Sequence, residues 1–157
     1  MAEERRTEVS RRLRAPRSRV YAALVDAGQV AQWRFPSEMS CEVHEFEPHV
    51  GGRVRISLTY DSPDRTGKTS GQTDTYAGRF ADLVPDAMVV EVDEFETSDP
   101  QLAGEMTTVI RLADAPEGGT ELWAVHLGLP AGISEADNAT GWREALDRLA
   151  ELVESDG

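Results

Sequence analysis

The sequence predicts an α+β protein in which one curved antiparallel sheet wraps around a long C-terminal helix. From Met39 to Leu129 the apolar residues recur with a period of two, the spacing of a strand with one buried face. From Ser134 to Glu154 they recur at steps of three and four, as in an amphipathic helix. Short turns rich in glycine and proline separate the strand candidates, so neighbouring strands should pair antiparallel.

The first elements of the chain are short. Thr7 to Ala15 alternates as a strand. A short helix is predicted from Pro16 to Asp26, with proline in its first turn, and Gly28 is expected to end it. A second helical turn is predicted from Gln29 to Trp33, so two short helices follow the first strand.

Six further strands are predicted from alternation, and the long helix follows them. The hairpin glycines Gly51-Gly52 and Gly118-Gly119 mark two of the turns between the strands. Ser134 is a capping residue for the long helix. Gly141 lies inside this helix at a cost of about 1 kcal/mol relative to alanine, which suggests that backbone or a ligand comes close just before Trp142, with a tolerated glycine as the alternative. The six predicted strands are Met39–Glu47, Arg53–Tyr60, Thr73–Val84, Met88–Glu96, Glu105–Ala113 and Glu121–Leu129.

Size and composition indicate a single domain that spans residues 1–157. The apolar fraction of 39% and the absence of a long apolar run predict a soluble, cytoplasmic protein that does not insert into a membrane. The formal charge of −13 argues against a nucleic-acid partner, because a polyanion is bound by a net basic face. The single cysteine, Cys41, excludes an internal disulfide and lies in a strand pattern, which favours a structural thiol over a nucleophile.

A cavity is expected between the sheet and the helix. Each has one apolar face, and the other is the only large partner available to bury it. A twisted sheet curled around a helix does not fill its concave side as tightly as two flat layers do. Alternation and the helix stripe predict these ligand-binding cavity residues: Trp33, Ile56, Leu58, Tyr76, Phe80, Val90, Ile110, Leu122, Ala124, His126, Trp142 and Leu146.

Six short stretches of the chain match a known family in the same order. They are Ala15–Leu24 (APRSRVYAAL), Gly51–Arg55 (GGRVR), Gly78–Pro85 (GRFADLVP), Gly118–Leu122 (GGTEL), His126–Pro130 (HLGLP) and Gly141–Leu146 (GWREAL). With these stretches and this order of elements, the chain resembles the helix-grip fold of the START-like, or SRPBCC, superfamily, and within it the proteins related to the C-terminal domain of the activator of heat-shock protein 90 ATPase. Where that family often has two tryptophans after the second short helix, this chain has Trp33-Arg34.

The resemblance implies a fold and a cavity, but little chemistry. A fold of this kind carries many functions, so the function has to be argued from the site. The family name also implies a chaperone as a partner and a role in the stress response. Polyketide cyclases share this fold and work with scattered cavity residues, so an enzyme stays open as an alternative.

His126 is the titratable group of most interest. It follows Leu122 and Ala124 at even spacing and should share their face, and the resemblance implies a place near the cavity mouth beside the last helix. A polar group in an apolar pocket would orient a ligand there. The more ordinary interpretation is a histidine that is satisfied by a backbone carbonyl at the end of a strand.

No motif indicates a metal, a cofactor or catalytic residues. Cys41 and His44 are three residues apart and fall on opposite sides of a strand, and His49 lies in the next turn. GxSxG, P-loop and GxGxxG patterns are absent. Four carboxylates lie close together in sequence: Glu91, Asp93, Glu94 and Glu96. They could supply a pair of carboxylates for acid–base chemistry, but we expect them to lie on a solvated outer face instead.

The outer face of the last strand predicts a protein interface. If Leu122, Ala124 and His126 point inward, the residues between them point outward and are apolar. We therefore expect a homodimer that contacts Trp123, Val125 and Leu127, with a covering loop as the alternative. The favoured function is non-catalytic binding of a small hydrophobic or amphipathic molecule. The alternatives are a chaperone-associated interaction module and a cyclase-like enzyme.

Overall fold

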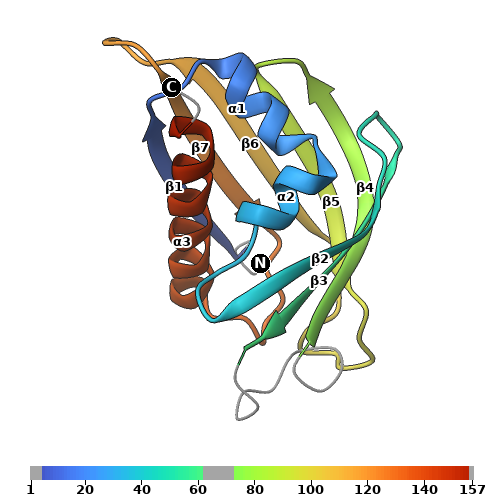
Figure 1. Cartoon of the computed structure of the whole chain (residues 1–157). Coiled ribbons are helices and arrows are strands. Elements are labelled where there is room, and N and C mark those ends of the chain that lie inside the picture. The colour runs from blue at the N-terminus through green and yellow to red at the C-terminus, as the bar shows by residue number, and fades with distance from the viewer. Residues whose placement is uncertain (1–4, 62–72, 156–157) are drawn as a thin grey trace.

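The computed structural model describes residues 5–61 and 73–155. Strands and helices follow one another in the predicted order (Figure 1). The strands are β1 (Arg6–Leu13), β2 (Met39–Phe46), β3 (Arg53–Tyr60), β4 (Thr73–Val84), β5 (Met88–Phe95), β6 (Met106–Asp114) and β7 (Thr120–Leu127). The helices are α1 (Arg17–Leu24), α2 (Ala27–Trp33) and α3 (Glu135–Glu154).

The seven strands form one antiparallel sheet in the order β1-β7-β6-β5-β4-β3-β2. Strands β2 to β7 pair with their neighbours in sequence, and β1 adds to the edge beside β7. The register shifts between Val43 and Glu45 and between Phe80 and Asp82, and such irregularities bend a sheet. The result is the curled half-barrel that the sequence predicts.

Helix α3 lies along the concave side of the sheet, across β1 and β7 (Figure 1). Leu146, Leu149 and Val153 on its apolar stripe are buried. The hydroxyl of Ser134 accepts a hydrogen bond from the backbone N–H of Asp137 at 3.2 Å, so Ser134 is the cap and the helix itself begins at Glu135. The helix-grip fold is therefore confirmed.

The boundary between the two short helices differs from the prediction. Helix α1 ends at Leu24, and Gly28 lies in the first turn of α2 rather than at the end of α1. Asp26 is the reason, because its Oδ1 accepts a hydrogen bond from the N–H of Gln29 at 3.0 Å and starts a new helix. Helix α2 then carries the chain across to β2 and delivers Trp33 and Arg34 to the interior.

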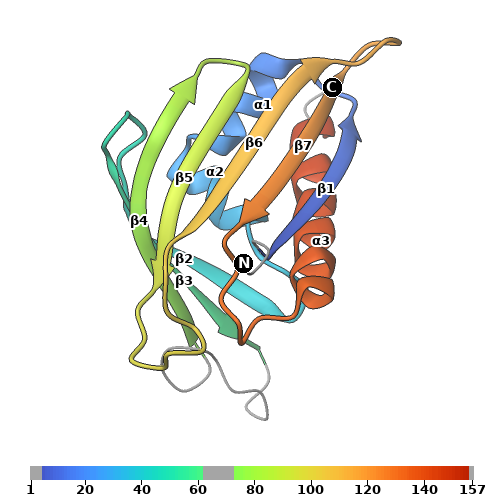
Figure 2. The ribbon, with the colours of Figure 1, turned by 180° about the vertical axis from the view of Figure 1, so that it is seen from behind.

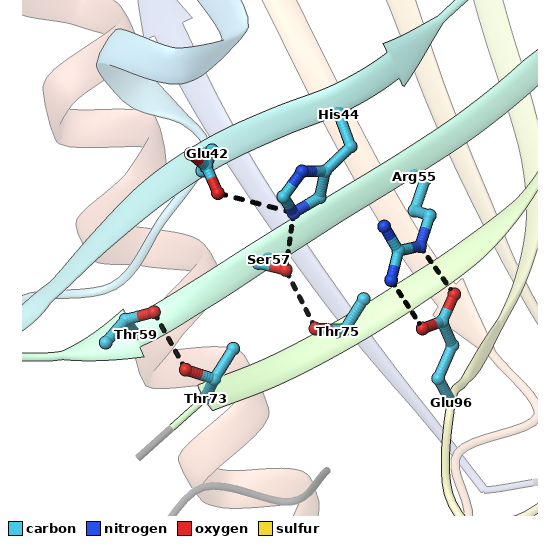
Figure 3. Close-up of polar contacts among 8 residues, drawn as sticks. All are labelled: Glu42, His44, Arg55, Ser57, Thr59, Thr73, Thr75 and Glu96. Carbon is cyan, nitrogen blue, oxygen red and sulfur yellow. Dashed lines mark hydrogen bonds and ion pairs between the residues drawn. The ribbon is translucent and has the colours of Figure 1, made fainter. Parts of the chain in front are cut away.

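The outer face of β2, β3 and β4 is held together by polar contacts (Figure 3). His44 and Ser57 share a hydrogen bond of 2.8 Å, and Ser57 in turn bonds to Thr75 at 2.8 Å. Arg55 donates two hydrogen bonds to Glu96, at 2.7 and 2.9 Å. This part of the outer face is therefore internally satisfied.

The outer face of β5, β6 and β7 is apolar by contrast. Trp123 is 43% exposed, and Val125 and Leu127 beside it are half-buried. Val125 lies opposite Val109, and Val109 lies opposite Val90. Seen from behind, no helix of the described chain covers these strands (Figure 2). Over residues 5–61 and 73–155, no helix is long and apolar enough to cross a membrane.

Candidate functional site

A cavity of about 610 Å³ lies between the concave side of the sheet and the N-terminal half of α3. The segment from Arg34 to Met39, which links α2 to β2, forms another wall. Gly141 of α3 also lines the cavity, and a Cβ at this position would meet Pro36 at an ordinary contact distance of 3.4 Å. The apolar part of the lining includes Phe35, Leu58, Phe95, Met106, Ile133 and Trp142.

Arg34 lines the cavity and forms a buried ion pair with Glu91, which lies behind the lining. The side chains of Arg34 and Glu91 are 11% and 2% exposed. The guanidinium of Arg34 also lies over the ring of Tyr76, with its central carbon 5.8 Å from the ring centre. Burial, the largest single effect, lowers the pKa of Arg34, but the charge and hydrogen bond of Glu91 together with Tyr76 and Asp93 raise the pKa above its ordinary value. Arg34 is therefore a permanent cation inside the protein.

A second carboxyl group, Asp93, lies two residues along β5 from Glu91 and is only 5% exposed. Burial and then the neighbouring charge of Glu91 raise its pKa well above the ordinary value, although Arg34 opposes them. Asp93 Oδ1 and Glu91 Oε1 have no hydrogen-bond partner among the described residues. One guanidinium thus faces two buried carboxyl groups.

The close approach of β4 and β5 at Asp93 depends on a glycine. Gly78 lies opposite Asp93 in the register. A Cβ on Gly78 would collide with the carbonyl oxygen of Val92 and with Asp93 Oδ1. The carboxyl group of Asp93 therefore occupies space that any other residue at position 78 would fill.

The expectation that Glu91 and Asp93 lie on a solvated outer face is wrong. In β5 the buried positions are Val89, Glu91 and Asp93, so the buried face of the strand is opposite to the one that Val90 and Val92 indicate. Val90 points outward, half-buried, and does not line the cavity, because it shares a strand face with Val92 rather than with Glu91. The ion pair with Arg34 is what makes burial of Glu91 tolerable.

His126 is satisfied by side chains rather than by a backbone carbonyl. The indole N–H of Trp142 donates to His126 Nδ1 at 3.1 Å, and the two rings meet edge to face at 6.1 Å. A side-chain hydrogen bond also links His126 to Asn138, whose Oδ1 accepts from the hydroxyl of Thr7 at 2.6 Å. Burial, followed by the charge of Arg34, lowers the pKa of His126 to about 4. This neutral histidine joins β7 to α3 and, through Asn138, to β1.

The predicted cavity residues fall into two groups apart from Val90. Four of them line the cavity: Leu58, Tyr76, His126 and Trp142. Seven are buried in the core instead, where they pack the sheet against the helices: Trp33, Ile56, Phe80, Ile110, Leu122, Ala124 and Leu146. Cys41 is half-buried, and burial raises the pKa of its thiol to about 11. No three His, Cys, Asp or Glu side chains within the described ranges form a group that could hold a metal.

Arg34, Glu91 and Asp93 are the site residues that the sequence analysis missed. The only signal for Arg34 is its position, where the resembled family often has a second tryptophan. Nothing in the sequence of β5 shows that Glu91 and Asp93 are buried, because their burial depends on the cation that pairs with them. That cation, Arg34, is 57 positions away from Glu91 in sequence.

The comparisons with known proteins agree with this geometry. Residues 14–154 match the model of the family described as activator of Hsp90 ATPase homolog 1-like protein. Protein CV1439 from Chromobacterium violaceum is 34% identical, with a TM-score of 0.84 over 95% of this chain and 96% of that chain. A protein from Rhodobacter sphaeroides is 23% identical, with a TM-score of 0.78 over 97% of this chain and 93% of that chain.

More distant structures share the fold. The AHSA1 protein from Silicibacter pomeroyi has a TM-score of 0.79 at 15% identity, over 98% of this chain and 100% of that chain. Among curated protein sequences none matches the chain. Because the family match spans nearly all of the described residues, the chain belongs to the activator of Hsp90 ATPase homolog 1-like family.

Proposed function

We propose that this protein binds a small amphipathic molecule in the cavity between the sheet and α3, without chemically changing it. The observation that carries the proposal is the cavity itself. Its volume of about 610 Å³ is within the range of small-molecule pockets, about 300 to 1,000 Å³. Its lining is apolar around Phe95, Met106 and Ile133, and polar around Arg34 and Asp93. A ligand with one apolar and one polar end suits such a lining.

Binding without catalysis is supported by the way the polar groups are used. Glu91 is held by Arg34, and His126 accepts a hydrogen bond from Trp142, so both are engaged in the fold. Glu91 Oε1 and Asp93 Oδ1 make no hydrogen bond to each other, unlike a carboxyl pair that shares a proton. These features favour a binding role over the cyclase-like alternative.

Filling the cavity should abolish binding. The variant Gly141→Phe places a ring at the cavity wall, where Pro36 is the only one of the described residues that comes close to the new Cβ. We expect an uncharged fluorescent probe such as Nile red to bind at least about tenfold more weakly, which corresponds to a loss of about 1.4 kcal/mol. Fluorescence titration measures this, with circular dichroism to verify folding.

The matched control is Arg143→Phe, which adds the same ring to the exposed face of the same helix. It should leave probe affinity unchanged. Ala124 is unsuitable for this purpose, because it is 2% exposed and packs in the core rather than lining the cavity. If Gly141→Phe is folded and binds the probe as the wild type does, the probe lies outside the cavity and the proposed function is wrong.

We further propose that a second copy of the chain covers the outer face of β5, β6 and β7. The support is the continuous row of Val125, Val109 and Val90 beside the exposed Trp123. Although the whole chain has a charge of −13, charges of both signs surround this face, which reduces repulsion between copies. The exposed charged residues on or beside this face are Arg6, Glu8, Arg79, Glu94 and Arg111, and Arg111 lies directly opposite Trp123.

Trp123→Ser should therefore convert a homodimer into a monomer, because it removes the largest apolar group of the face. Sedimentation velocity measures the mass. Val50→Ser is the matched control, since Val50 is 61% exposed in the turn between β2 and β3. A monomeric wild type at high concentration would contradict the dimer. A monomer that binds a heat-shock chaperone and loses it on Trp123→Ser would assign the face to that chaperone.

A further inference from the structure

The cavity that carries the proposed function has a strongly acidic lining. Among the described residues that line it, Arg34 is the only side chain with a permanent positive charge, and it is already paired with Glu91 outside the lining. His126 is neutral at pH 7, because burial lowers its pKa to about 4. The lining carboxyl groups are Glu38, Asp74, Asp93, Asp137 and Glu144.

Among the carboxyl groups that line the cavity, Asp93 is best placed to bind a polar group of a ligand. It is 5% exposed, and its Oδ1 has no hydrogen-bond partner within the described part of the chain. A buried acceptor without a donor is unfavourable, so a ligand group that supplies the donor removes that cost on binding. The glycine at position 78 leaves room for the carboxyl group in this position.

Aromatic rings border the same region. Tyr76, Trp142 and Phe95 all line the cavity, and Tyr76 already lies under the guanidinium of Arg34. The faces of aromatic rings attract cations, because their π electrons carry partial negative charge. An anionic head group would instead meet the carboxyl groups of the lining, with a guanidinium that Glu91 has already neutralised.

We propose that the cavity binds an organic cation, with an ammonium group against Asp93 and an apolar body between the aromatic rings. The inference rests on the proposed function and names the chemical class of its ligand. An ammonium group supplies both the hydrogen-bond donors and the positive charge that the carboxyl group of Asp93 needs in order to ionise inside the protein.

Binding should release a proton from Asp93 wherever the pH lies below the raised pKa of its carboxyl group. A bound ammonium favours the ionised carboxylate, so the pKa of Asp93, raised in the free protein, falls on binding. Amine affinity should therefore increase with pH up to that raised pKa and then level off. The charged and titratable groups around Asp93 are Arg34 after α2, Glu38 before β2, Asp74, Tyr76 and Arg79 on β4, Glu91 on β5, His126 on β7, and Asp137 and Glu144 on α3.

The test compares three probes of nearly the same shape: phenethylamine, phenethyl alcohol and phenylacetate. Isothermal titration calorimetry at pH 7 should give an affinity about tenfold higher for the amine than for the alcohol, and the lowest affinity for phenylacetate. Repeating the amine titration on the acid side of the raised Asp93 pKa, in two buffers of different ionisation enthalpy, should reveal proton release, and the alcohol should show none. Equal affinities, or a preference for phenylacetate, would overturn the proposal.

Two variants separate Asp93 from the general charge of the protein. Asp93→Asn keeps the size of the side chain and should remove the tenfold preference and the proton release while alcohol binding persists. Glu94→Gln removes one negative charge from the exposed side of the same strand and should change neither. An amine preference that survives in Asp93→Asn would refute the role of Asp93.

The same data distinguish failure of this inference from failure of the proposed function. If Gly141→Phe leaves the binding of all three probes unchanged, the probes bind elsewhere and the cavity function itself fails. If Gly141→Phe weakens all three but the wild type does not prefer the amine, the cavity binds ligands and only the cation assignment fails.

Discussion

Replacing Arg34 with methionine should lower the free energy of unfolding by about 3 to 5 kcal/mol, because it leaves the carboxylate of Glu91 buried without its cation. Methionine keeps most of the side-chain length, so little of the loss comes from an empty space. Urea denaturation followed by circular dichroism measures the change. The double variant Arg34→Met with Glu91→Leu should recover most of the stability, since neither charge is then buried alone.

Arg55→Met is the control for Arg34→Met. Arg55 pairs with Glu96 through two hydrogen bonds, but its side chain is 40% exposed and lies on the outer face (Figure 3). Exposed pairs contribute little to stability, so its denaturation midpoint should change far less than that of Arg34→Met. Equal effects of the two substitutions would mean that burial of the Arg34 pair is not what matters.

Trp33→Ala should also cost about 3 to 5 kcal/mol, because it removes a large ring from the core. Trp33 is 1% exposed, and its indole N–H donates to the carbonyl of Ala23 at 2.9 Å, which ties α2 to α1. Chemical denaturation of the variant measures the loss.

Trp33→Phe separates packing from hydrogen bonding at this position. It keeps most of the ring volume but leaves the buried carbonyl of Ala23 without the indole donor, so it should cost only about 1 to 3 kcal/mol. A loss below about 1 kcal/mol for Trp33→Ala would show that the ring does not hold the two helices in place.

Periodicity was sufficient to predict the fold. The change from a period of two to a period of 3.6 near Ser134 separates the sheet from α3, and the predicted strand ends agree with the structure to within two residues. The seven strands can adopt few arrangements once every connection is short, and the antiparallel order followed from that.

The site was less predictable, because the alternation of apolar and polar residues along a strand shows which residues are polar and not which are buried. In β5 the valines at 90 and 92 indicated an inward face, but the structure buries Glu91 and Asp93. That choice depends on Arg34, which comes from a different element and makes burial of a carboxylate possible. Trp33 was expected at the cavity, yet its ring is directed to α1 while the next residue enters the cavity.

The position of β1 beside β7 also constrains the order in which the chain can fold during synthesis. Thr120 donates a hydrogen bond to the carbonyl of Ala15, which precedes it by 105 residues, and β1 packs against α3 as well. Strand β1 leaves the ribosome before β7 and cannot pair with it until β7 has followed. Contacts of such sequence separation form slowly. The emerging chain must therefore keep a half-apolar strand unpaired while the six later strands are synthesised, and exposed strands of this kind are prone to aggregation.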